Sequence, residues 1–318
     1  MRKKMKRLHF IFILLMVSLI FACGGNPEPF PITVQESGDM RIVTHRFGES
    51  QIPLNPQRVV ALGQEYMLAD LLDAGIHVVA SNVNLIDIAG FEQGELEDIY
   101  LFLATEPNLE TIVSLNPDLI IGVDYFIQRI GYNKLSAIAP TVAVDTEGEW
   151  RRTYVETLSV FGKADEAELN LAAYEARVAS AKAELKANGK LISVGTIYPD
   201  ELPAAWVTGP TAVPQLLIDL GFTLSPSLEQ AREFNPRDGR IFFSMERLDL
   251  FAADTLILLQ SNQVEGESDS LAKAQLNPLW AALPAVQANR VFILDRLGYP
   301  GLRGRNMLLD DLLALLSQ

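Results

Sequence analysis

Residues 165–190 read DEAELNLAAYEARVASAKAELKANGK, and the interpretation of the whole chain depends on this stretch. It predicts one long helix, because Ala, Glu, Leu and Lys dominate and no Gly or Pro interrupts the run. We expect Asp165 to cap the helix with Glu168 as its capping-box partner, and Asn188-Gly189 to end it. At about 1.5 Å per residue such a helix spans roughly 33 Å, which is enough to connect two domains.

The helix carries one apolar stripe. Its members alternate in spacings of three and four: Leu171, Tyr174, Val178, Ala181 and Leu185. A helix packed inside a single domain would carry the same stripe, so the segments on its two sides decide between these interpretations.

Two short patterns recur on either side of the helix in the same order. Leu-Leu-Asp-Ala-Gly at 71–75 matches Leu-Ile-Asp-Leu-Gly at 217–221. A glutamate and an aspartate with equal separation form the second match: Glu110 with Asp118, and Glu246 with Asp254. A repeat of about 140 residues is too long for a solenoid and predicts two related lobes.

Short apolar runs alternate with helical segments in both halves. Strands are expected at 59–62, 76–80, 119–123, 141–144, 191–195, 222–224, 255–259 and 291–294, and a hairpin at 41–54. Apolar strands between helices are typical of parallel sheets covered on both faces. The predicted fold class is α/β: two Rossmann-like lobes with mostly parallel sheets joined by one long helix.

The predicted domains are an N-terminal lobe at 41–160, the interlobe helix at 161–190 and a C-terminal lobe at 191–318. Residues 1–22 begin with basic residues and continue into an apolar run too short for a comfortable membrane span, so they are predicted to be a signal peptide. A flexible tether is expected at 23–40, where Gly, Pro and polar residues show no apolar period.

Cys23 is the only cysteine, and it directly follows the signal segment. This arrangement resembles the bacterial lipoprotein signal, in which the chain is cleaved before the cysteine and the thiol is acylated. An exported, membrane-anchored lipoprotein facing the periplasm or the cell exterior is therefore predicted. A plain signal peptide, or an uncleaved anchor with an incidental cysteine, is the alternative.

The chain is acidic, with a formal net charge of −14. Nucleic acid is not expected as a partner, because phosphate binding needs a basic face. Strong negative charge keeps a protein soluble and monomeric, so a monomer is expected.

Seven motifs occur in order along the chain: NPQRVV at 55–60, NLETI at 108–112, LNPDLII at 115–121, IAPT at 138–141, FGKA at 161–164, SME at 244–246 and PLW at 278–280. With them the chain resembles the iron-siderophore and cobalamin substrate-binding proteins of bacterial ABC importers. The resemblance covers roughly residue 41 to the C-terminus. It implies a ligand held between two lobes, small lobe motions, and an ABC permease dimer with its ATPase as partner.

In that family one surface glutamate on each lobe meets arginines of the permease. The motifs carry these roles onto Glu110 and Glu246. Two carboxylates at equivalent places on two lobes could grip a dimeric partner and orient it. The alternative is that each is an acid favoured by the positive end of a helix.

Ligands of open α/β sheets bind beyond the carboxyl ends of the strands. Side chains that follow strands and suit an anionic chelate are predicted to bind the ligand: Tyr66, Tyr125, Arg129, Trp206, Arg237, Tyr299, Arg303 and Arg305. Residues 296–305 hold three arginines and no acid. Arginine suits carboxylate, hydroxamate or catecholate oxygens, and aromatic rings suit a flat ligand face, so the predicted ligand is a ferric siderophore. Any single arginine could instead pair with a nearby acid.

Direct metal ligation by the protein is not expected. Only His45 and His77 remain after the signal segment, and both are interpreted as structural. No Ser-His-Asp set or Walker loop is visible, and no Gly-rich dinucleotide turn follows the first strand, so an enzyme is not expected and no cofactor is predicted. Cobalamin, haem or a bare metal ion remain alternative ligands, although the arginines argue against cobalamin.

Overall fold

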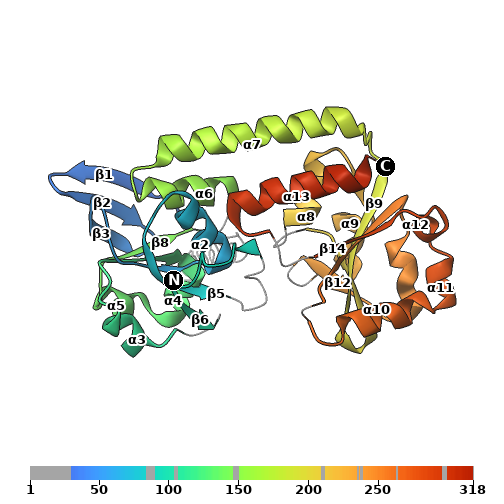
Figure 1. Cartoon of the computed structure of the whole chain (residues 1–318), viewed down its shortest axis with the longest axis horizontal. Coiled ribbons are helices and arrows are strands. Elements are labelled where there is room, and N and C mark those ends of the chain that lie inside the picture. Colours follow the sequence, from blue (N-terminus) through green and yellow to red (C-terminus); the bar gives the residue numbers. More distant parts are fainter. Residues whose placement is uncertain are drawn as a thin grey trace, which may run out of the picture.

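The computed structural model describes residues 30–83, 90–103, 107–145, 150–208, 212–234, 236, 239–262, 264–295 and 299–317. The predicted signal segment, Cys23 and Arg237 lie outside these ranges. Figure 1 shows two lobes side by side, with the helices α7 and α13 lying along them. The two-lobed α/β fold predicted from the sequence is confirmed.

Five parallel strands form the sheet of the N-terminal lobe, in the order β6-β5-β4-β7-β8. They are β4 Val59–Leu62, β5 Val78–Val83, β6 Tyr100–Leu103, β7 Leu119–Val123 and β8 Thr141–Val144. The helices of this lobe are α2 Gln64–Asp73, α3 Leu109–Ser114, α4 Asp124–Ile130, α5 Tyr132–Ser136 and α6 Trp150–Ser159. The sequence predicted four of these strands and missed β6.

A small antiparallel sheet lies at the outer end of this lobe (Figure 1). It consists of β1 Thr33–Ser37, β2 Met40–His45 and β3 Gly48–Pro53. The predicted hairpin corresponds to β2 and β3. The prediction of an unstructured tether over 23–40 is wrong for residues 33–37, because these residues pair with β2 along their whole length.

The sheet of the C-terminal lobe has the order β12-β10-β9-β13-β14, and β11 also pairs with β9. Its strands are β9 Leu191–Tyr198, β10 Leu202–Trp206, β11 Thr223–Leu224, β12 Arg240–Phe242, β13 Thr255–Gln260 and β14 Val291–Asp295. The strands β10 and β12 are antiparallel to their neighbours and were not predicted. The helical segments are η3 Pro199–Glu201, α8 Ala212–Asp219, α9 Leu228–Ala231, η4 Arg232–Phe234, η5 Met245–Phe251, α10 Glu267–Gln275, α11 Pro278–Ala281 and α12 Pro284–Gln287.

The two aspartates of the repeated pattern make the same hydrogen bonds in both lobes. The Asp118 N–H donates to the Arg58 carbonyl at 3.1 Å, and Oδ1 accepts the Arg58 N–H at 2.9 Å. The Asp254 N–H donates to the Leu191 carbonyl at 3.1 Å, and Oδ2 accepts the Leu191 N–H at 3.0 Å. Each aspartate therefore joins the starts of two neighbouring strands in its sheet.

The glycine-ended pattern closes two equivalent helices, α2 and α8. Gly75 and Gly221 both adopt the left-handed conformation, with φ of +70° and +94°. The residue after each glycine donates its N–H to the carbonyl of Leu71 or Leu217, at 2.9 and 3.0 Å. This is the same helix-ending motif in both lobes, as the repeat predicted.

The long helix α7 spans Ala164–Leu185. Of its predicted stripe, Tyr174, Val178 and Ala181 are buried. The predicted cap is wrong: Lys163 occupies the N-cap position without a side-chain hydrogen bond, and the left-handed Lys186 ends the helix. The outer face of α7 is polar, and within the described ranges no helix is both long and apolar enough to span a bilayer.

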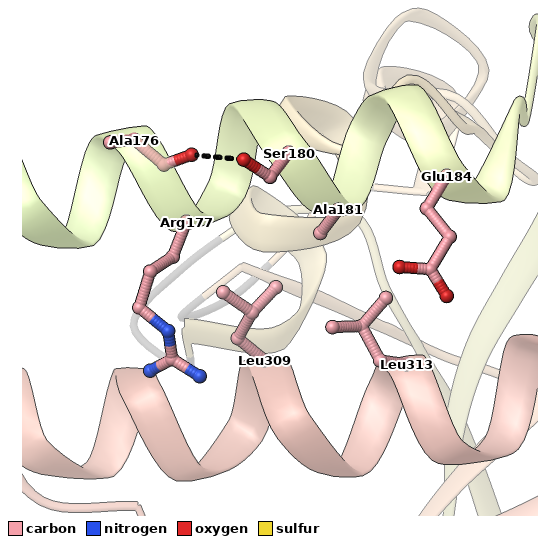
Figure 2. A pocket seen from close by; sticks show the side chains of 7 residues that line it. All are labelled: Ala176, Arg177, Ser180, Ala181, Glu184, Leu309 and Leu313. Atoms are coloured by element: carbon pink, nitrogen blue, oxygen red, sulfur yellow. Dashed lines mark hydrogen bonds between the residues drawn. The ribbon is translucent and has the colours of Figure 1, made fainter.

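A second long helix, α13 (Gly301–Leu316), lies against α7. Arg177 of α7 donates to Asn306 and pairs with Asp310, both on α13. Further along, Figure 2 shows Leu309 and Leu313 projecting from α13 toward α7, with Ala181 close to them. Although α13 belongs to the segment predicted as the C-terminal lobe, it also packs on α2 of the N-terminal lobe.

One hydrophobic core extends through both lobes. It includes Val59 and Leu119 of the N-terminal sheet, Ile192 of the C-terminal sheet, and Tyr174 and Leu309 of the two long helices. Because α7 and α13 belong to the same core as both sheets, they hold the lobes in one arrangement more stiffly than a flexible linker could.

Candidate functional site

A cavity of about 350 Å³ opens at the carboxyl ends of β4 and β7, where the sequence predicted ligand binding. The start of α2, the start of α4, one face of α6 and the first turns of α13 surround it. We call this cavity the binding pocket. Its lining residues are Gly63, Gln64, Tyr66, Met67, Asp70, Val123, Tyr125, Phe126, Trp150, Thr153, Tyr154, Thr157, Gly301, Leu302 and Arg305.

Aromatic rings make up much of the pocket wall. The predicted ligand residues Tyr66 and Tyr125 both lie here, with 40% and 51% of their surface exposed. Large aromatic surfaces left open to solvent can cover the apolar parts of a ligand. Trp150 and Tyr154 of α6 complete the wall and were not among the predicted site residues, although Trp150 follows β8 as the other candidates follow their strands.

The turn from β4 into α2 is strained at the pocket. Gln64 has a φ of +59°, a left-handed conformation that non-glycine residues seldom adopt. Its N–H donates to Asn82 Oδ1 of β5 at 3.1 Å, which holds the turn in place. Backbone strain of this kind concentrates at functional sites.

Arg305 supplies the positive charge of the pocket. Its guanidinium carbon lies 3.7 Å from the centroid of the Trp150 ring, in a cation–π stack. Burial lowers the pKa of Arg305, and no carboxylate within the described residues forms an ion pair with it. A guanidinium that stacks on an aromatic ring at a pocket wall is suited to bind an anionic oxygen of a ligand.

Asp70 lines the same pocket, one helical turn after Tyr66 on α2. Its Oδ1 accepts the Leu302 N–H at 2.8 Å and so ties the start of α13 to the N-terminal lobe. Burial raises the pKa of Asp70 to about 7, against the opposing effect of this hydrogen bond.

The structure holds Arg303 in an ion-pair network outside the pocket. It pairs with Asp73 of α2 at 3.0 Å, and its Nη1 donates to Glu95 at 2.9 Å. Two carboxylates already pair with this guanidinium, which gives Arg303 a structural role. Its role in ligand binding stays a prediction.

Tyr299 is also engaged elsewhere. Its hydroxyl donates to Asp311 at 2.6 Å, and burial together with this carboxylate raises its pKa. It does not line the pocket that the described residues form. Arg129 is exposed on α4 and likewise outside that lining.

Trp206 lies in the C-terminal sheet and is buried. Its indole N–H donates to Thr196 Oγ1 at 2.9 Å, and the Arg240 guanidinium stacks 4.7 Å from its ring. Arg240 also donates to the Tyr198 hydroxyl at 2.6 Å. Trp206, Arg240 and Tyr198 combine aromatic rings with a guanidinium, as the pocket does. They belong to the other lobe, however, and do not line the pocket.

Glu110 and Glu246 are both exposed, each in the first turn of a short helical segment. The Asn108 side chain caps α3 by accepting the Glu110 N–H at 2.8 Å. The segment holding Glu246 is the 3₁₀ helix η5. Both carboxylates are accessible to a partner.

The two histidines have structural partners. His45 is buried, its Nε2 lies 3.0 Å from Ser50 Oγ, and burial lowers its pKa to about 4. His77 Nδ1 lies 2.5 Å from the Gln57 carbonyl oxygen. Across the part of the chain that the structure describes, no three His, Cys, Asp or Glu side chains come together as a metal site.

The chain is similar in sequence to known proteins of one family. The sequence profile of the family described as periplasmic binding protein matches residues 91–296. The iron(3+)-hydroxamate-binding protein FhuD of Bacillus subtilis is 27% identical over 296 residues, which cover 91% of this chain and 90% of FhuD. The Fe(3+)-citrate-binding protein YfmC of the same organism is 27% identical over 314 residues, which cover 94% of this chain and 92% of YfmC.

A solved structure shares the fold along nearly its whole length. The crystal structure of Staphylococcus aureus SirA complexed with staphyloferrin B superimposes with a TM-score of 0.73 and 27% sequence identity. The match covers 87% of this chain and 99% of the SirA chain.

Proposed function

Because this chain belongs to the periplasmic binding protein family, we propose that it captures a ferric siderophore in the binding pocket and delivers it to the permease dimer of an ABC importer. The observation that carries the proposal is Arg305, stacked on Trp150 inside an aromatic pocket at the carboxyl ends of parallel strands. A guanidinium there selects for an anionic iron chelate.

The names of the relatives support this ligand class. FhuD is named for iron(3+)-hydroxamate, YfmC for Fe(3+)-citrate, and SirA was solved with staphyloferrin B. The chain acts as a binding protein without turnover, so ligand should bind saturably, one to one, and be released unchanged.

A quenching titration tests the ligand class. Trp150 lines the pocket, so a chelate that enters should quench tryptophan fluorescence. The panel is a trianionic iron(III) tricatecholate, an uncharged iron(III) trihydroxamate, haem and cobalamin. Saturable quenching that is strongest for the anionic chelate supports the proposal, and tighter binding of cobalamin or haem would replace it with an alternative ligand.

Delivery requires a docking surface, and we assign this role to Glu110 and Glu246. The double variant Glu110→Ala with Glu246→Ala should keep the affinity for the chelate, because neither residue lines the pocket, but should abolish iron uptake by cells. Uptake of radioactive iron and binding to the purified protein measure the two effects. The matched control replaces two other exposed helix acids, Glu168 and Glu229, by Ala. A loss of affinity in the first variant would place its residues in the ligand site.

Membrane attachment through a lipid on Cys23 is part of the same proposal. The substitution Cys23→Ala should move the protein from the membrane fraction to the soluble exported fraction, because a single thiol would carry the anchor. Immunoblotting of the separated fractions measures this, and a variant that stays with the membrane would indicate an uncleaved signal anchor.

A further inference from the structure

Asp70 and Arg305 are the two charged residues among the described lining of the binding pocket. They lie on different helices, α2 and α13, which meet at the pocket. The charge that a ligand encounters there depends on whether the Asp70 carboxyl is ionised. If it is, the two side chains neutralise each other; if it is protonated, the pocket is positively charged.

The position of the Asp70 carboxyl is fixed by the start of α13. Its Oδ1 accepts the Leu302 N–H at 2.8 Å. Gly301 is packed so closely against Asp70 that a Cβ at this glycine would overlap Oδ1. Rotation of the carboxyl away from the start of α13 would break its hydrogen bond with the Leu302 N–H.

Charged and titratable groups surround Asp70. Asp73 lies on the same helix, Arg303 and Arg305 lie on α13, and Tyr154 lies on α6. Arg303 is already shared between Asp73 and Glu95, so it compensates Asp70 only weakly. Burial therefore has the largest effect on the pKa of Asp70. The Leu302 N–H and the two arginines oppose it, and Asp73 adds a smaller effect in the same direction as burial.

These surroundings place the titration of Asp70 in the neutral range. Burial raises its pKa to about 7, and the charge of Asp73 acts in the same direction. Near pH 7 both protonation states of the free protein are therefore populated. A small change in the local charge is enough to shift this balance.

We propose that capture of an anionic iron chelate in this pocket is coupled to the uptake of one solvent proton by the Asp70 carboxylate. This inference rests on the proposed function. A negative ligand beside Arg305 is repelled by ionised Asp70, and transfer of a proton from water to the free carboxylate oxygen removes that repulsion. By linkage, acidification must then tighten the binding of an anionic chelate, whereas an uncharged chelate responds little.

Isothermal titration of the full exported chain tests this coupling. The iron(III) tricatecholate is titrated at pH 7 in two buffers of different ionisation enthalpy, which yields the number of protons taken up. The wild type should take up a measurable fraction of a proton per chelate, averaged over the ionised and protonated forms of the free protein, and its affinity should rise several-fold from pH 8 to pH 6. Asp70→Asn keeps an oxygen to accept the Leu302 N–H but cannot titrate, so it should take up none.

Two controls isolate Asp70. Asp73→Asn removes a carboxylate one turn later that does not line the pocket, and it should retain proton uptake. Protonation of the chelate itself is common to all variants and cancels in the comparison. The carboxyl carbon resonance of Asp70 in the wild type, followed by NMR from pH 5 to 9 with and without chelate, should shift its midpoint upward on binding, whatever the stability of the variant.

The outcomes separate the two proposals. Proton uptake that persists in Asp70→Asn, or no uptake in the wild type that binds the chelate, overturns the coupling and leaves the proposed function standing. Failure of every chelate to bind the wild type overturns the proposed function and the coupling together.

Discussion

Arg305→Gln is expected to weaken the binding of an anionic iron chelate by between about tenfold and a hundredfold, the effect of losing one charge-assisted hydrogen bond. Glutamine retains part of the volume and can still lie against Trp150, but it brings no charge. The fold should tolerate the change, since no described carboxylate depends on Arg305 for an ion pair.

The measurement is a titration of the tricatecholate and the uncharged trihydroxamate against wild type and variant. The anionic chelate should lose most of the affinity, and the uncharged one should lose much less. Arg303→Gln is the matched control, since Arg303 lies two residues away on α13 and is held by Asp73 and Glu95. Its chelate affinity should change little.

Equal losses for both chelates in Arg305→Gln would show that the guanidinium acts through shape and not through charge. A larger loss of affinity in Arg303→Gln than in Arg305→Gln would mean that Arg303 contacts the anionic group of the chelate. The sequence also predicted Arg303 to bind the ligand.

Gly304→Ala is expected to destabilise the protein by several kcal/mol, on the order of 3–5, which is the range of severe packing defects. Gly304 lies in the first turn of α13, and a Cβ there would overlap the main chain of Tyr299. Main chain cannot swing aside as a side chain can, so the start of α13 has to move. That movement would carry Leu302 and Arg305 away from the pocket.

Urea unfolding followed by circular dichroism measures the loss of stability. Met307→Ala on the same helix is the control: its side chain is 46% exposed, so its removal should change the free energy of unfolding by less than about 1 kcal/mol. A stability of Gly304→Ala equal to that of the control would mean that the segment before α13 can rearrange without cost.

Local patterns in the sequence predicted most of the regular elements. The strand runs, the α7 stripe and the two repeated patterns all recur in the structure, because each depends on residues close together in the chain. The strands that were missed are β6, β10 and β12. Of these, β10 and β12 pair antiparallel to their neighbours, and so depart from the pattern of parallel strands between helices that the sequence predicted. The cap expected at Asp165 failed because the helix begins at Ala164, two residues before the predicted start, so that Asp165 lies inside its first turn.

The candidate site was predicted less completely. Tyr66, Tyr125 and Arg305 meet in one pocket, although the sequence placed them in two separate lobes. Arg303 and Tyr299, from the same arginine-rich segment, have acidic partners instead. Asp70 and Trp150 were not among the predicted site residues. Trp150 carried the signal of a residue that follows a strand, whereas nothing local to Asp70 distinguishes it from an ordinary helix residue.

The amino-acid sequence by itself determined that there are two related α/β lobes and a long helix between them, since periodicity and repeated hydrogen-bonding patterns are properties of contiguous residues. Only the tertiary structure decided which arginine lines the binding pocket, because that depends on α13 packing against α2. The return of this one helix to the N-terminal lobe pairs Arg303 with Asp73 and places Arg305 over Trp150. Whether two charges pair depends on the distance between segments that are far apart in the sequence, and the spacing of residues along the chain does not reveal that distance.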